Sequence, residues 1–377
     1  MSALGVRLTV LAGPTVPVPL PAPLTERLRA VEVTENDQNR SVFTLTFDAG
    51  RSGALDALGP VGSPLAAFAR VVVIVTWGAM PKVLSDGIVT ETELDPGAAT
   101  LKVTGEDVSF LLDREEHVTE HPALTDHLQV LRILASYATR GVLPGVVPPP
   151  SFDVPLPTER VPVQHGTDLQ HLTTLARRHG YVTYAVPGPA PGTSTFYWGP
   201  PVRAGIPQPA LSVDLGPETN VTELNVRTEA HGPVTVAGAV NDRRMRVTVP
   251  VSVSASLRPP LSAIPLWAQH AGRIRAKRLR GATDDGVRAL SEAQAEVDRS
   301  VDAVIAEGKL DGARYGGLLR PRGLVGVRGA GWSHDGLWYV REVKHELSPG
   351  GYRANFTLAR DGHGSTVPVV PVGWENR

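Results

Sequence analysis

The sequence contains no cysteine among its 377 residues. Disulfides, cysteine-ligated zinc sites and thiol nucleophiles are therefore excluded, and stability must come from packing or from assembly into an oligomer. The chain also lacks an uninterrupted apolar run of about 18 residues, so no membrane span is expected. Residues 1–14 have neither a basic segment nor a small-residue cleavage site, which argues against a signal peptide.

Charge is also scarce. Charged residues make up 20% of the chain, the net charge is −1 and the pI is about 6.8. A nearly neutral chain exerts no general attraction on nucleic acid or on an anionic membrane, so no nucleic-acid specificity is expected. Lysine occurs at only five positions, and we interpret the preference for arginine as the mark of a bacterial genome rich in G and C. The six Trp and seven Tyr are too scattered to suggest a sugar-binding platform.

Glycine and proline are abundant, with 38 and 34 residues spread along the chain. Short runs rich in β-branched residues lie between them. In residues 41–48, for example, Phe43, Leu45 and Phe47 alternate with threonines, which is the period of a half-buried strand. Turn residues between such runs predict a mostly β protein of the α+β class.

The pattern divides the chain into three regions. Residues 1–116 are expected to form a small antiparallel β-barrel. Residues 117–215 are expected to form a small α/β domain. Residues 216–377 are expected to form a second barrel, with a helical insertion at about 264–308.

Helices are predicted where apolar residues recur at helical spacing, in residues 125–137, 167–179, 266–280 and 287–306. The second of these begins with Thr167 and Gln170, the pattern of a capping box. Gly180 follows it, where a glycine commonly ends a helix.

The first and last regions share a pattern that suggests an internal duplication. Each has an apolar run, an Asp-Gly pair expected to form a hairpin turn, a strand, and then a Glu-Leu pair followed by Pro-Gly. These features fall at Asp86-Gly87 and 93–97 in the first region, and at Asp335-Gly336 and 346–350 in the last. The intervals between them differ by four residues, so the alternative is that any two β-hairpins look alike.

Residues 319–360 resemble the C-terminal module of the phage late control D family. These are the baseplate hub proteins of contractile phage tails and tail-like injection systems, and the same module occurs in the hub part of VgrG proteins. The residues that carry the resemblance are Leu319, Arg320, Pro321, Gly329, Gly331, 335–340, His345, 351–358 and Arg360. Residues 85–89, 101–107 and 170–180 also resemble the family.

This resemblance implies two related tube-like antiparallel β-barrel domains with an intervening α/β domain. It also implies a homotrimer that presents six barrels in a pseudo-sixfold ring and joins a hexameric inner tube to a trimeric spike. The implied partners are an inner tube or tube-initiator protein, a spike protein and other baseplate proteins. Only 17 residues follow Arg360, so the spike is expected to be a separate protein. The resemblance further implies that the chain assembles in the bacterial cytoplasm as part of a phage tail-like particle and is released with that particle into the extracellular space.

One motif points to different chemistry. His117, Glu120 and His121 match the His-x-x-Glu-His pattern of zinc metalloproteases, whose histidines share one face of a helix. Pro122 follows at once, so a polar loop is favoured here. This motif is the basis of the alternative that the chain is a tail-associated peptidoglycan hydrolase or an injected effector.

Other charged clusters have simpler interpretations. Residues 273–280 hold five basic residues but no interleaved aromatic, so a solvated or inter-subunit helix face is favoured over a nucleic-acid patch. Asp113, Glu115 and Glu116 flank Arg114 and predict a salt-bridged turn rather than a glycosidase carboxylate pair. His345 is expected to be a barrel or interface residue. We therefore assign no catalytic, cofactor-binding or metal-ligating residue, and expect a structural protein rather than an enzyme.

Overall fold

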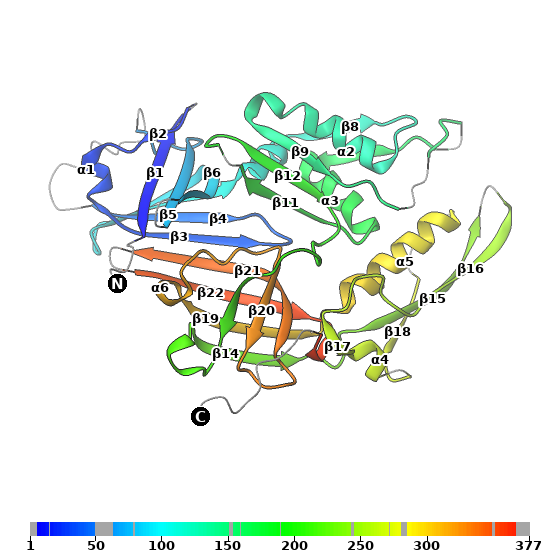
Figure 1. The fold of residues 1–377 in the computed structure, drawn as a ribbon. Coiled ribbons are helices and arrows are strands. Elements are labelled where there is room, and N and C mark those ends of the chain that lie inside the picture. The colour runs from blue at the N-terminus through cyan, green and yellow to red at the C-terminus, as the bar shows by residue number, and fades with distance from the viewer. Residues whose placement is uncertain are drawn as a thin grey trace.

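A computed structural model describes residues 6–14, 16–49, 63–77, 80–150, 154–158, 160–188, 190–242, 245–270, 272–279, 285–348 and 351–366. Strands dominate it, and a 13-stranded sheet runs through its centre (Figure 1). The mostly β, α+β class that the sequence predicts is confirmed. Among the described helices, none has the length and apolar character needed to cross a membrane.

The central sheet is built from two sets of strands. The first set comprises β1 (Arg7–Gly13), β3 (Leu28–Asn36), β4 (Val42–Asp48), β5 (Arg70–Trp77), β6 (Met80–Asp95) and β7 (Thr100–Asp107), with the short β2 (Val18–Pro19) and α1 (Ala22–Thr25) beside it. The second set comprises β13 (Gln208–Ser212), β14 (Val221–Thr228), β19 (Val304–Asp311), β20 (Leu324–Arg328), β21 (Gly336–Ser348) and β22 (Gly351–Arg360), with α6 (Gly312–Tyr315).

The alternation of apolar and polar residues decides which face of these strands is buried. Phe43, Leu45 and Phe47 of β4 are fully buried, as their period-2 spacing predicts, and the intervening threonines are half-buried. Most buried residues of the two strand sets belong to one continuous hydrophobic core, while Leu324 and Tyr339 belong to a smaller separate cluster.

The two strand sets have the same topology. The first runs in the order β3-β4-β7-β6-β5-β1, and the second runs β14-β19-β22-β21-β20-β13. They differ in their last member, because β1 is antiparallel to β5 whereas β13 is parallel to β20. The duplication suggested by the sequence is therefore visible as a repeated strand order.

Register irregularities recur at equivalent places in the two sets. Pairing shifts by one residue between Val89 and Glu91 of β6, and between Val340 and Glu342 of β21. It shifts again at Arg29 in β3 and at Thr222 in β14. Bulges are specific features of a fold rather than defects, so their shared positions strengthen the equivalence.

The prediction of a hairpin turn at Asp86-Gly87 is wrong. Both residues lie inside β6, where Asp86 is buried and forms an ion pair with Arg70 at 2.7 Å. Gly87 is required because a Cβ there would lie 2.2 Å from the carbonyl oxygen of Glu106 on β7. The equivalence of the bulges aligns Glu91 with Glu342, so the Asp-Gly pairs are not structural counterparts. Pro349-Gly350 lies outside the described residues.

A small α/β region lies beside the first strand set, next to β6 (Figure 1). It comprises β8 (Glu116–Glu120), α2 (Asp126–Ala135), β9 (Val142–Val146), β10 (Val163–Thr167), α3 (Asp168–Arg178), β11 (Val182–Pro187) and β12 (Ser194–Gly199). Within the described ranges, 3-10 turns lie at Val108–Asp113, Ala138–Arg140 and Gly216–Glu218. The capping box of Thr167 and Gln170 is confirmed at the start of α3, and Gly180 follows the helix with a positive φ of 67°.

The segment inserted between β14 and β19 begins earlier in the chain, and is less helical, than the insertion predicted at about 264–308. It comprises β15 (Val234–Asp242), β16 (Val247–Val253), β17 (Ser262–Pro265), α4 (Leu266–Gln269), β18 (Arg275–Arg278) and α5 (Gly286–Ser300), with β23 (Gly362–Ser365) paired to β17. The predicted helix at 266–280 is a single turn followed by a strand, because Arg275–Arg278 pairs in parallel with β15.

The predicted helix at 287–306 ends early, at Ser300. The β-branched residues after it begin β19, which lies between β14 and β22 in the central sheet. The apolar residues that suggested one long helix thus belong to two elements, the buried face of α5 and the central strand β19.

Candidate functional site

His117 and Glu120 lie on strand β8, which is neither a helix nor the predicted loop, and His121 follows directly after the strand ends. His117 and His121 are four residues apart along extended backbone, which separates their Cα atoms by about 13 Å. Glu120 points to the opposite face of the strand, since successive side chains alternate. This geometry cannot bring both imidazoles to one metal ion with the carboxylate beside them.

His121 instead belongs to a buried polar network. Its Nε2 lies 3.2 Å from Gln164 Oε1, and its ring stacks on that of His171 with centroids 5.4 Å apart. His171 Nε2 lies 3.1 Å from Gln129 Oε1 on α2. Burial and the neighbouring His121 lower the pKa of His171 to about 4, so its ring is neutral at physiological pH. The network links β8, β10, α2 and α3 from within.

The three carboxylates near residue 114 do not converge. Asp113 forms an ion pair with Arg40 and accepts a hydrogen bond from Thr167 Oγ1. Glu115 and Glu116 are exposed. The salt bridge that the sequence predicts therefore exists, but it is made by Arg40 rather than by Arg114, whose guanidinium lies 5.8 Å from the ring centroid of Phe68.

The basic run at 273–280 lies beside a surface pocket of about 740 Å³. Strand β18, α3 and α5 line this pocket together, and Arg280 lies outside the described residues. Lys277 forms an ion pair with Glu296 of α5, and Arg299 contacts the same carboxylate at 3.1 Å. The predicted helix face is thus a strand whose charge is partly neutralised by α5.

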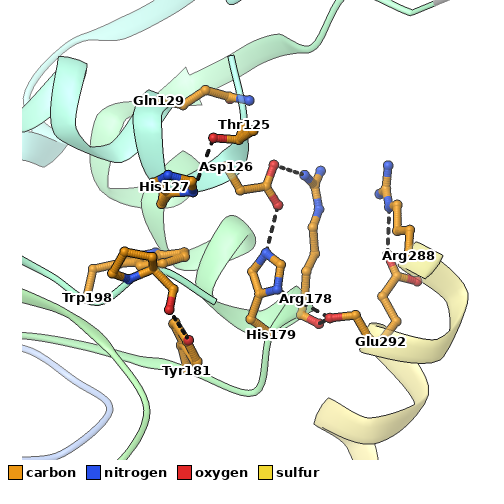
Figure 2. Close-up of polar contacts among 12 residues, drawn as sticks. Thr125, Asp126, His127, Gln129, Arg178, His179, Tyr181, Trp198, Arg288 and Glu292 are labelled. Carbon is orange, nitrogen blue, oxygen red and sulfur yellow. Dashed lines mark hydrogen bonds and ion pairs between the residues drawn. The ribbon is translucent and has the colours of Figure 1, made fainter. Parts of the chain in front are cut away.

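The C-terminal end of α3 is held between α2 and α5 (Figure 2). Asp126 of α2 accepts hydrogen bonds from Arg178 Nη1 at 3.4 Å and from His179 Nε2 at 3.0 Å. Ser291 Oγ of α5 donates to the carbonyl oxygen of Arg178 at 3.3 Å. Burial raises the pKa of Asp126, but the bond from His179 and the charge of Arg178 outweigh it and hold the pKa below its ordinary value. A charged carboxylate thus anchors the point where α3 meets the insertion.

The two strand sets meet where β3 pairs with β21, and we call this pairing the internal joint (Figure 1). Here β21 residues 342–347 pair with β3 residues 36–31 in antiparallel order. His345, expected to be a barrel or interface residue, is fully buried at this joint. Its Nε2 lies 3.2 Å from Glu35 Oε2 and its Nδ1 lies 2.9 Å from Tyr352 Oη. Since a carboxylate can only accept, the Nε2–H donates to Glu35 and the tyrosine hydroxyl donates to Nδ1.

The charge at the internal joint is fixed by Glu35. Burial raises the pKa of Glu35, but Arg320 and the hydrogen bond from His345 outweigh that effect and lower it to about 2. Arg320 Nη1 contacts the carboxylate at 3.0 Å and also donates to the carbonyl oxygen of Leu84. Burial lowers the pKa of His345, although its bond to Glu35 opposes this, so the imidazole is neutral beside a charged carboxylate.

Arg322 ties three parts of the chain together and was not predicted from the sequence. Its guanidinium donates to the carbonyl oxygens of Asn36 at 3.0 Å and Ala185 at 2.9 Å, and to Ser41 Oγ at 3.1 Å. It also lies 4.1 Å from the ring centroid of Tyr184. The only sequence signal for this role is its place just after the Leu-Arg-Pro triplet that carried the resemblance.

The buried polar clusters of the described residues lie at structural joints. Within the described ranges, no group of three or more His, Asp or Glu side chains is arranged to hold a metal ion. The perturbed carboxylates and imidazoles instead lie where elements far apart in the sequence meet. The arrangement can hold two strand sets and an α/β region in one fixed geometry.

The sequence matches no protein-family model and no curated protein. The structure, however, is similar to several solved ones. A tail protein from Neisseria meningitidis MC58 is 14% identical and superposes with a TM-score of 0.64 over 95% of this chain and 97% of that one. The 43 kDa tail protein of prophage MuSo2 from Shewanella oneidensis is 15% identical, with a TM-score of 0.62 over 95% and 99%.

A third similar structure comes from a component of the Escherichia coli type VI secretion system, which is described as similar to the bacteriophage T4 tail proteins gp27 and gp5. It is 13% identical, with a TM-score of 0.56 over 92% of this chain and 77% of that one. The chain therefore has the fold of phage tail and VgrG-like proteins, as the resemblance of residues 319–360 implies, whereas its division into two tube-like barrels stays a prediction.

Proposed function

We propose that this chain is the structural hub of the baseplate in a contractile phage tail-like injection system. In this role it is a homotrimer with pseudo-sixfold symmetry that joins a hexameric inner tube to a trimeric spike. Its partners are an inner tube or tube-initiator protein, a separate spike protein and other baseplate proteins. The particle assembles in the bacterial cytoplasm and leaves the cell with the hub inside it.

The repeated strand order carries this proposal. Two topologically equivalent strand sets in one chain provide two similar faces, so three chains would provide six. A sixfold tube that stacks on a threefold spike needs such an adaptor, and cyclic symmetry makes it from identical subunits. The similar tail proteins from Neisseria and Shewanella add support, because the match extends over nearly the whole length of each chain.

The enzymatic alternative has less support. In its one motif, the side chain of Glu120 at the end of β8 lies on the opposite face of the strand from that of His117. The polar clusters described above are also engaged in contacts between elements. We therefore propose a non-enzymatic role.

Native mass spectrometry of the full chain, alone and after mixing with the cognate inner tube protein, tests this proposal. The expected species has three times the 40.1 kDa mass of the chain, and electron micrographs should show closed rings stacked on tubes. A chain that stays monomeric at all concentrations and forms no rings with tube protein would contradict the proposal. So would cleavage of peptidoglycan that is lost in the variant His117→Ala.

A further inference from the structure

The internal joint has a counterpart that a single chain leaves open. Because β3 corresponds to β14 and β21 corresponds to β6, the equivalent pairing would bring β14 against β6. Within one chain these two strands are far apart, since β14 ends the sheet and β6 lies in the other strand set. From this, and resting on the proposed trimer, we infer that β14 of one copy pairs with the C-terminal half of β6 in the next copy.

Both strands have a free edge among the described residues. The sheet order ends at β14, which pairs with β19 on one side. The N-terminal half of β6 pairs with β5, and this pairing ends where Arg70 of β5 lies opposite Ile88 of β6. Residues 90–95 of β6 therefore pair with β7 alone. Open strand edges carry unpaired N–H and C=O groups that readily accept another strand.

Side chains are buried at the internal joint, where two strands pair, and are more exposed at the open edges of β14 and β6. At the internal joint, Val33 and His345 are both fully buried. Their counterparts are Val226 on β14, which is half-buried, and Leu94 on β6, which is 44% exposed. Apolar side chains thus stand at the open edges in the positions that the internal joint covers.

The shared bulges fix the register of the proposed pairing. The bulge alignment makes β6 residues 91–95 the counterparts of β21 residues 342–346, and β14 residues 225–228 the counterparts of β3 residues 32–35. Transferring the register of the internal joint sets the following residues opposite one another: Thr92 and Thr228, Glu93 and Arg227, Leu94 and Val226, Asp95 and Asn225.

These cross-strand pairs are chemically matched. Opposite charges, paired threonines and paired apolar residues are each favourable directly across two strands. Glu93 and Arg227 are exposed in the single chain, where Glu93 lies 3.8 Å from Lys102 and Arg227 lies 3.5 Å from Glu307. One pair is unfavourable, because Glu91 falls opposite Glu229 just past the end of β14, where Arg227 lies 3.8 Å from Glu229. A slip of one residue would lose every match, since it exchanges the faces of the strand.

The contact is heterologous, so it propagates from copy to copy. Each chain offers β14 as one edge and β6 as a different one, and such contacts close into rings when the rotation allows it. In the proposed trimer, three internal joints would alternate with three joints between chains, giving six equivalent junctions around the ring.

Disulfide trapping tests the pairing without background, because the chain has no cysteine. The double variant Thr92→Cys/Thr228→Cys places two exposed positions directly opposite each other across the proposed joint. Under mild oxidation of the full chain, most of it should convert to covalent trimers that reduction returns to monomers. The matched control Thr92→Cys/Glu229→Cys, shifted by one residue and leaving Arg227 in place, should give at least tenfold less trimer. Circular dichroism of both variants verifies that they fold like the parent chain.

A charge exchange provides the second arm. Arg227→Glu should raise the chain concentration needed for half-assembly about tenfold, and adding Glu93→Arg should restore it. Trimers by native mass with no preferential cross-link and no charge rescue would overturn the inference and leave the hub proposal standing. Monomers throughout, with no cross-link, would overturn both.

Discussion

Replacing Glu35 by glutamine tests whether the internal joint depends on a buried charge. Glu35 is 3% exposed and lies between Arg320 and His345. The difference between its pKa of about 2 and the ordinary value of 4.5 corresponds to about 3 kcal/mol of stability at neutral pH, at 1.36 kcal/mol for each pH unit. The amide keeps the shape of the side chain but removes this charge. We therefore expect Glu35→Gln to lower the free energy of unfolding by about 2–3 kcal/mol at pH 7.

The sign of the pH dependence follows from the direction of the pKa change. Because the pKa of Glu35 is lower in the folded chain, its contribution is complete above about pH 4.5 and is lost as the pH falls toward 2. Glutamine does not titrate. The gap in stability between the parent and Glu35→Gln should thus shrink by about 1.4 kcal/mol for each pH unit below about 4.5.

Urea denaturation followed by circular dichroism, at several values between about pH 7 and pH 3.5, measures this gap. Glu32→Gln is the matched control, because Glu32 is on the same strand and its ion pair with Lys344 is partly exposed. That variant should lose less than about 1 kcal/mol. A gap for Glu35→Gln that stays constant from pH 7 to pH 3.5, or one no larger than the control's, would refute the reasoning.

Two further substitutions probe packing, each followed by thermal or urea unfolding. Trp198→Ala should cost about 3–5 kcal/mol because the indole is fully buried and donates to the carbonyl oxygen of Leu172, whereas Trp332→Ala, at a 60% exposed position, should cost less than about 1 kcal/mol. Gly105→Ala should cost about 1–3 kcal/mol because the added Cβ would lie 2.4 Å from the carbonyl oxygen of Ile88. Its control is Gly317→Ala, which should be neutral or slightly stabilising because no atom lies within 4 Å of the added Cβ. Equal losses of stability for the two variants of either pair would contradict the packing argument.

Local patterns predicted the elements whose structure is decided locally. The alternation of Phe43, Leu45 and Phe47 gave β4, and Thr167 with Gln170 marked the start of α3, because a half-buried strand and a capping box each depend on a few neighbouring residues. The class of the fold followed from many such segments.

Patterns failed where distant partners decide the structure. Residues 275–278 become a strand because β15 lies beside them, about 40 residues earlier in the chain, and nothing in their own sequence requires it. His117 and His121 have the spacing of a helical motif, but β8 pairs with β10 at His117, and the backbone N–H of His121 donates to the carbonyl oxygen of Pro162.

The sequence patterns also did not predict which residues hold the joints together. Arg322 acts through Asn36 and Ala185, which are 286 and 137 residues away. Glu35 lies in an ordinary strand sequence, and its role appears when Arg320 and His345 are placed beside it. A single sequence does not encode such encounters in any local spacing.

The distance along the chain between β3 and β21 has a consequence for synthesis. Asn36 and Glu342, which are hydrogen-bonded across the internal joint, are 306 residues apart. The ribosome makes β3 long before β21, so the first strand set has an uncovered edge until almost the whole chain has emerged. During that interval β3 can capture the β21 of another nascent chain, which would yield a domain-swapped species. Folding of this protein is therefore expected to be slow, and its yield should fall as crowding on the polysome increases.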